Sequence, residues 1–90
     1  MMETLEHRRP TVLIVDDDAE IREQLKWALA KEYSVVEAED RATAVARARA
    51  ECPALVTLDL GLPGDVDGAT EGMAALEEIL AMNRLTKVVV

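Results

Sequence analysis

The sequence predicts an α/β fold: a doubly wound parallel sheet in an incomplete three-layer αβα sandwich with the order βαβαβαβ. Three observations predict it. Short apolar runs without polar alternation are typical of strands covered on both faces. Segments with apolar residues at helical spacing lie between these runs, and the connections are short. This alternation is typical of right-handed crossovers that place helices on both faces of a parallel sheet.

The predicted strands are the most apolar short segments of the chain. Residues 11–15 (TVLIV) form a continuous aliphatic and β-branched run, which ends at three aspartates. Residues 33–38 are a short run of mixed character, and residues 54–59 end in a single carboxylate. Residues 87–90 begin a fourth strand.

Helices are predicted over residues 19–31, over residues 41–51, and from Thr70 to about residue 82. Asp18 and Asp40 are placed to cap the first two. The second helix has small side chains that let it lie close to a sheet, at Ala42, Val45, Ala46, Ala48 and Ala50. The expected buried residues of the other two are Ile21, Leu25, Ala28 and Leu29, and Met73, Leu76, Ile79, Leu80 and Met82. For Trp27, which falls off the strict apolar stripe, we expect core packing, and a docking role is the alternative.

Ninety residues fit one domain with a modest core. Residues 1–10 are expected to form an N-terminal arm, in which His7 is solvated and has no role, and residues 11–90 form the domain. The formal charge of -8 repels a phosphate backbone, so we expect no direct contact with nucleic acid.

Cys52 is the single cysteine, so no disulfide forms within one chain, and we expect it to be a small buried hydrophobe. No apolar run is long enough to span a bilayer, and the first residues lack the apolar core of a signal peptide. A cytoplasmic protein without membrane contact is expected.

An acidic constellation is the strongest functional signal. Asp16 and Asp17 follow the first strand and Asp59 follows the third. If these strands are neighbours in a parallel sheet, the three carboxylates emerge at one edge, where ligands of such sheets bind. Clustered carboxylates repel one another and need a cation, and their hard oxygens suit Mg²⁺. Helix capping alone is the alternative explanation, and for Asp18 we prefer it.

The residues that carry these acids resemble a known family. Residues 12–18 (VLIVDDD) and 58–63 (LDLGLP), in this order and at this separation, are similar to the receiver domain of two-component response regulators. The resemblance extends from about Thr11 to Val90. It implies the flavodoxin-like (CheY-like) version of the predicted fold, and a signalling phosphoacceptor in place of a classical enzyme.

The resemblance also implies roles for individual residues. Asp59 corresponds to the aspartate that accepts a phosphoryl group from the histidine of a sensor kinase. Asp16 and Asp17 match the acidic pair that holds Mg²⁺ together with Asp59. Gly61 lies where the family offers a backbone carbonyl to the metal, and Pro63 matches the proline that shapes the next loop. The expected partners are a sensor histidine kinase, an output domain that regulates transcription, and a second copy of the chain in a homodimer.

The sequence departs from the family's pattern in the loop that follows Pro63. The family carries one Asp-Gly pair there, whereas Asp67-Gly68 and Glu71-Gly72 both compete for the place. The helical spacing that follows favours Gly72, which leaves inserted residues at 64–70. This loop, residues 25–27 (LKW) and residues 57–63 (TLDLGLP) are similar to receivers of sigma-54-dependent activators associated with exopolysaccharide and PEP-CTERM loci.

A second departure is length. The family has five βα units and uses a Ser or Thr after its fourth strand and a Lys after its fifth, and this chain has neither position. An apolar strand at 87–90 exposes an open edge. We therefore expect a fragment of a longer regulator that binds Mg²⁺ weakly, is poorly phosphorylated and self-associates.

Two other functions stay open. Asp16-x-Asp18 after a strand resembles the nucleophile motif of haloacid-dehalogenase-like phosphatases, although Ala19-Glu20 follow where Thr or Val is usual. The third hypothesis is an interaction module that is never phosphorylated, in which the helices dock a partner.

Overall fold

The computed structural model describes residues 9–62 and 69–90 of the chain. The elements, in order, are β1 (Thr11–Val15), α2 (Ala19–Leu29), β2 (Ser34–Ala38), α3 (Arg41–Glu51), β3 (Leu55–Leu58), α4 (Thr70–Met82) and β4 (Lys87–Val89). The predicted order is confirmed, with the first helix and the second and third strands shorter than expected. The arm's His7, Pro63 and the Asp67-Gly68 pair lie outside the described residues.

The strands form one parallel sheet in the order β2-β1-β3-β4. Val15 at the end of β1 pairs with Ala38 of β2 and with Leu58 of β3, so these three strands end level with one another. The expected neighbourhood of the first and third strands is therefore confirmed. It brings the residues that follow β1 and β3 to the same edge of the sheet.

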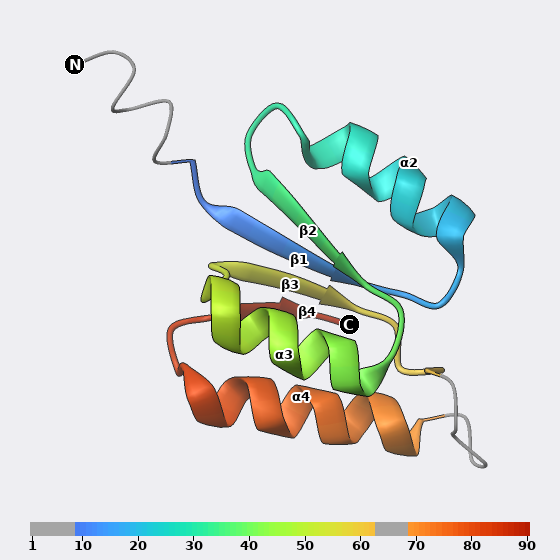
Figure 1. Cartoon of the computed structure of the whole chain (residues 1–90), viewed down its shortest axis with the longest axis vertical. Coiled ribbons are helices and arrows are strands. Elements are labelled where there is room, and N and C mark those ends of the chain that lie inside the picture. The colour runs from blue at the N-terminus through green and yellow to red at the C-terminus, as the bar shows by residue number, and fades with distance from the viewer. Residues whose placement is uncertain (1–8, 63–68) are drawn as a thin grey trace.

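Helices cover both faces of the sheet, with α2 on one side and α3 and α4 on the other (Figure 1). The main core lies under α3 and α4. There Leu13 and Val15 of β1 pack with Val56 and Leu58 of β3 and with Ile79 of α4. The alternate β1 residues Val12 and Ile14 belong to the opposite face and are also fully buried. The absence of polar alternation in β1 thus has its explanation in two covered faces.

The buried stripe predicted for α2 is wrong. No residue of α2 is buried; Ala28 is exposed, Ile21 is 42% exposed, and Leu25 and Leu29 are half-buried. The reason is that α2 packs mainly on β1 and β2 and has no extensive contact with another helix among the described residues. Core packing is also wrong for Trp27, which is 73% exposed and whose indole N–H donates to Glu23 Oε2 at 2.8 Å.

The stripe predicted for α4 is confirmed for Ile79, which is buried, and for Leu76, which is half-buried against the core, and is wrong for the other three residues. The buried residues of α4 are Gly72, Ala75 and Ile79, whereas Met73, Leu80 and Met82 are exposed. Small residues face inward because α4 lies close to α3 and to the loop after β3. In α3 the buried residues are Ala44, Val45 and Ala48, so the expected small inward face is there, with Ala42, Ala46 and Ala50 exposed.

Cys52 is exposed, contrary to the expectation of a buried hydrophobe. It ends α3 in a left-handed conformation with φ 48°, and its N–H donates to the Ala48 carbonyl. Such a C-cap turns the chain away from the helix axis and leaves the side chain at the surface, while Pro53, the next residue, is buried.

Candidate functional site

The backbone at the ends of β1 and β3 is fixed by one further step of strand pairing. The N–H of Asp16 donates to the Ala38 carbonyl at 3.0 Å, and the N–H of Asp59 donates to the Val15 carbonyl at 2.9 Å. Each acid therefore leaves the sheet from a held backbone position. Because β1 and β3 are held in the sheet, the Cα positions of Asp16 and Asp59 are fixed at its edge.

Asp16, Asp17 and Asp59 come together at this edge, as the sequence predicts. Each contributes a carboxylate oxygen, and these oxygens all lie within 4.8 Å of one another. Asp16 is buried with 8% of its surface exposed, Asp59 is half-buried and Asp17 is exposed. The cluster thus has a buried floor and an open side from which a ligand can approach.

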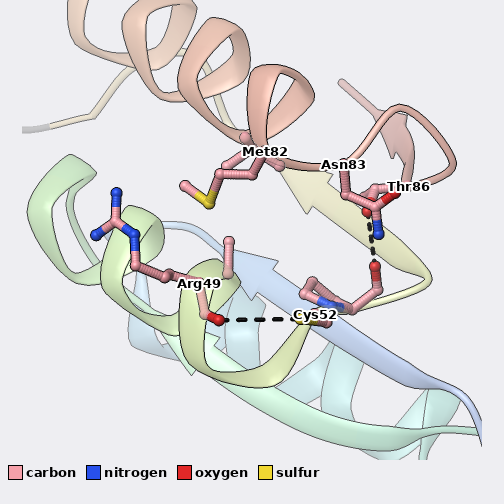
Figure 2. A pocket seen from close by; sticks show the side chains of 8 residues that line it. Arg49, Cys52, Met82, Asn83 and Thr86 are labelled. Carbon is pink, nitrogen blue, oxygen red and sulfur yellow. Dashed lines mark hydrogen bonds between the residues drawn. The ribbon is translucent and has the colours of Figure 1, made fainter.

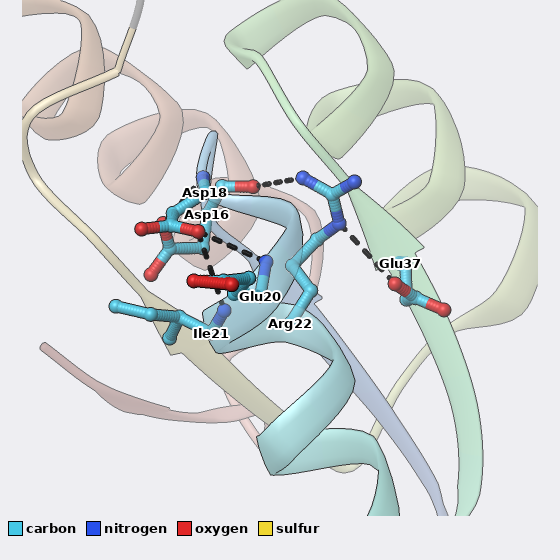
Figure 3. A network of polar contacts seen from close by, with 6 residues as sticks. All are labelled: Asp16, Asp18, Glu20, Ile21, Arg22 and Glu37. Atoms are coloured by element: carbon cyan, nitrogen blue, oxygen red, sulfur yellow. Dashed lines mark hydrogen bonds and ion pairs between the residues drawn. The ribbon is translucent and has the colours of Figure 1, made fainter.

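Asp16 is held by several contacts, most of which Figure 3 shows. Its Oδ1 accepts from the N–H of Asp18 at 2.9 Å. Its carbonyl accepts from Arg22 Nη1 at 2.6 Å, and Arg22 Nε in turn donates to Glu37 Oε1 at 3.2 Å. No role is predicted for Arg22 from the sequence alone. The one feature of the sequence that could have indicated this contact is the position of Arg22 one helical turn after the Asp18 cap.

Asp18 caps α2, as expected. Its Oδ1 accepts from the N–H of Glu20 at 2.9 Å and from that of Ile21 at 3.4 Å, and Asp18 is exposed. Its carboxylate is thus engaged with the helix N-terminus. Asp40 caps α3 in the same way, accepting from the N–H of Thr43 at 2.8 Å.

The electrostatics of the cluster favour a bound cation. Desolvation raises the pKa of Asp16 above its usual range, and repulsion from Asp59, Asp17 and Asp18 adds to this, while the hydrogen bond from the Asp18 N–H opposes it. No ion pair between described residues involves Asp16, Asp17 or Asp59. Three hard oxygen donors that have no ion-pair partner among the described residues fit Mg²⁺, which usually binds through carboxylates and keeps several waters.

The loop after β3 holds Asp59 from its other side. The Gly61 N–H donates to Asp59 Oδ1 at 3.1 Å, and Leu62 is buried in the main core. Gly72 of α4 packs directly on this loop: a Cβ at Gly72 would lie 2.3 Å from the Leu60 carbonyl oxygen. Gly72 therefore occupies a position where only glycine fits, in agreement with its assignment over Gly68, which lies outside the described residues.

Two hollows lie away from the acidic cluster. A polar hollow of about 320 Å³ is lined by Arg22, Glu37 and Arg47, among others. A mainly apolar one, also about 320 Å³, lies between the C-terminal ends of α3 and α4 (Figure 2). There the Thr86 hydroxyl donates to the Pro53 carbonyl at 2.9 Å, so the buried polar group of this hollow is already paired.

Comparisons with known proteins agree with the geometry. The family profile described as response regulator receiver domain matches residues 12–90. Among curated protein sequences none matches the chain. The part of the chain that the structure describes contains no helix that is both long and apolar enough to cross a membrane.

Solved structures of receiver domains share the fold. The receiver domain of NtrX from Brucella abortus is 32% identical with a TM-score of 0.73, covering 86% of this chain and 62% of that one. A longer NtrX structure from the same organism is 30% identical with a TM-score of 0.77, covering 88% of this chain and 18% of that one. The receiver domain of the Erythrobacter litoralis response regulator PhyR is 28% identical with a TM-score of 0.73, covering 89% of this chain and 60% of that one.

This chain spans 18% of the longer NtrX chain and less than two thirds of the two isolated receiver domains. The family profile nevertheless matches nearly all of it, over the strands and helices that build the acidic edge. The chain belongs to the response regulator receiver domain family of two-component systems.

Proposed function

We propose that this chain accepts a phosphoryl group on Asp59 from the phosphohistidine of a sensor kinase. Asp16, Asp17 and Asp59, with the backbone carbonyl of Gly61, would hold the Mg²⁺ that the reaction needs. The observation that supports the proposal is the convergence of three carboxylate oxygens within 4.8 Å at the ends of two neighbouring strands. Capping does not account for it, because Asp18 alone caps α2.

In this proposal Asp59 is the nucleophile, and the metal site beside it neutralises charge on the phosphoryl group. Asp59 Oδ1 accepts the Gly61 N–H, which orients the carboxylate and leaves its other oxygen to attack phosphorus. As the new P–O bond forms, the P–N bond breaks and its electron pair returns to the imidazole of the kinase. Bound Mg²⁺ would neutralise charge on the phosphoryl oxygens. The product is an acyl phosphate whose added charge can shift a nearby two-state surface.

The partners follow from the family and belong to this proposal. They are a sensor histidine kinase and an output domain, which would act in transcription as a response regulator does. Homodimer formation and the narrower likeness to sigma-54-dependent activators stay predictions, as do the cytoplasmic location and the division of the chain after residue 10.

Phosphorylation with a small donor tests the proposal directly. The purified chain is incubated with acetyl phosphate and Mg²⁺, and the acyl phosphate is trapped by borohydride and located by mass spectrometry. We expect the label on Asp59, with none after Asp59→Asn and none when Mg²⁺ is chelated. The matched control is Glu39→Gln, which removes an exposed carboxylate next to the end of β2 and leaves labelling intact.

Two results would contradict it. A label on Asp16 indicates the phosphatase chemistry of the haloacid-dehalogenase type. No label, together with no amide shifts at Asp17 or Asp59 on adding Mg²⁺ and beryllofluoride, indicates an interaction module. Amide shifts are the suitable probe because they report at Asp17 and Asp59 themselves, whereas the Trp27 side chain is largely solvent-exposed and contacts Glu23.

A further inference from the structure

Arg22 connects three parts of the molecule that meet at the acidic edge. Its backbone belongs to α2, its Nη1 donates to the Asp16 carbonyl after β1, and its Nε donates to Glu37 in β2. The side chain of Arg22 is 16% exposed, so these contacts are largely shielded from solvent. Arginine suits such a junction because its planar fork presents several donors in fixed directions.

The contact to the Asp16 carbonyl acts on the peptide that joins Asp16 to Asp17. A peptide unit is planar, so fixing its carbonyl also fixes the direction in which the chain enters Asp17. Asp17 itself is exposed, and its carboxylate has no hydrogen-bond partner among the described residues. The direction of the Asp17 side chain therefore depends on the backbone that Arg22 holds.

The ion pair between Arg22 and Glu37 also limits the electrostatic repulsion between the Arg22 guanidinium and a bound metal ion. A guanidinium beside a metal site repels the metal, but Arg22 is paired with Glu37 at 3.2 Å. The pair brings hydrogen-bond donors to the Asp16 carbonyl with little net charge. It is joined to the backbone of the cluster and not to any of its carboxylates.

We propose that Arg22 is a positioning residue for divalent-cation binding: through the Asp16 carbonyl it aims the Asp17 carboxylate at the shared site. The inference rests on the proposed function, because it assigns Mg²⁺ to Asp16, Asp17 and Asp59. Contacts to groups that orient metal ligands typically alter metal affinity by ten- to a hundredfold when they are removed.

A comparison of two arginine variants tests the inference. If Arg22 acts by positioning Asp17, its removal weakens Mg²⁺ binding; if it acts only through its charge, its removal strengthens Mg²⁺ binding. Arg22→Met and Arg47→Met each remove one positive charge from the polar hollow, but the structure gives Arg47 no contact with the acidic edge. Loss of charge alone tightens Mg²⁺ binding in both. Loss of positioning weakens it, by about tenfold, in Arg22→Met only. Arg22→Lys keeps the charge without the fork and should also weaken binding.

Mg²⁺ affinity is measured by calorimetry, and the order of the Asp17 amide by ¹⁵N relaxation and hydrogen exchange in the metal-free protein. We expect Arg22→Met and Arg22→Lys to weaken Mg²⁺ binding and to loosen the Asp17 amide, with a cooperative unfolding transition retained. Arg47→Met should bind Mg²⁺ at least as tightly as the wild type, with an unchanged Asp17 amide.

Wild-type affinity, or tighter binding, in a folded Arg22→Met protein would overturn the inference while leaving the phosphoacceptor proposal standing. An unchanged Asp17 amide in both Arg22 variants would do the same. If the wild type itself binds no Mg²⁺, the proposed function and the role of Arg22 in cation binding fail together.

Discussion

Replacing Gly72 by alanine tests whether the close approach of α4 to the loop after β3 builds the site. An added Cβ would lie 2.3 Å from the Leu60 carbonyl oxygen, 2.4 Å from its Cα and 2.7 Å from its carbonyl carbon. All three atoms are backbone, so no rotamer change relieves the clash. Reaching ordinary contact at 3.4 Å requires a movement of about 1.1 Å. Leu60 lies between Asp59 and Gly61, so the movement reaches Asp59, the proposed phosphoacceptor.

Two opposing effects decide the stability of this variant. Overpacking that forces a backbone shift costs about 1–3 kcal/mol. Alanine favours a helix over glycine by about 1 kcal/mol at interior positions, and by less in the first turn where Gly72 lies. The clash should win, which leaves the variant less stable by about 1–2 kcal/mol. In a domain of this size 1 kcal/mol corresponds to about 4–8 °C in Tm.

Thermal unfolding followed by circular dichroism measures the effect. The control pair Glu77→Gly and Glu77→Ala gives the propensity difference at an exposed position of the same helix. We expect Gly72→Ala to lower Tm by at least about 4 °C, although alanine is the better helix former. An unchanged or higher Tm would show that α4 moves freely over Leu60, and would refute the idea that their contact fixes the loop.

Three further predictions concern single polar groups. Because the pKa of Asp16 is raised, the contribution of Asp16 to the stability of the metal-free protein falls as pH rises from 3.8 through its folded pKa. Asp16→Asn should therefore gain Tm over the wild type across that range, and an equal Tm at all pH values argues against the burial cost. The hydrogen bond from Thr43 lowers the pKa of Asp40, so Asp40→Ala should lower Tm at neutral pH, with a difference that shrinks as pH falls below 3.8. Thr57 Oγ1 is buried without a partner among the described residues, so Thr57→Val should stabilise the protein by about 1 kcal/mol in denaturant titration, and a loss would point to an unseen partner.

The sequence was sufficient to predict the elements and the acidic edge. Each relevant signal is local and strong: an aliphatic run for β1, an aspartate before each of the first two helices, and an acid directly after β1 and β3. Bringing Asp16 and Asp59 together needs only one further assumption, that β1 and β3 are neighbours. Parallel βαβ topology makes that assumption natural.

The orientation of the helices could not be predicted in the same way. Hydrophobic spacing marks an apolar stripe but does not say how much of it another element covers, and among the described residues α2 packs mainly on β1 and β2. In α4 the inward face is set by close approach, which selects Gly72 and Ala75 over the larger Met73. Cys52 was misjudged because a left-handed C-cap overrides the usual burial of the residue type.

Arg22 was missed for a related reason. On a helix, an arginine beside other charged residues has the pattern of a solvent-exposed face, and its carbonyl acceptor lies in a strand end that no helical periodicity reveals. The acids themselves were found because a cluster of like charges violates what folding alone prefers, which is typical of functional sites. The groups that hold such a cluster obey the ordinary rules of packing and pairing. The metal-ligating acids of such a site can therefore be predicted from the sequence, whereas a residue that positions them, such as Arg22, is found only in the structure.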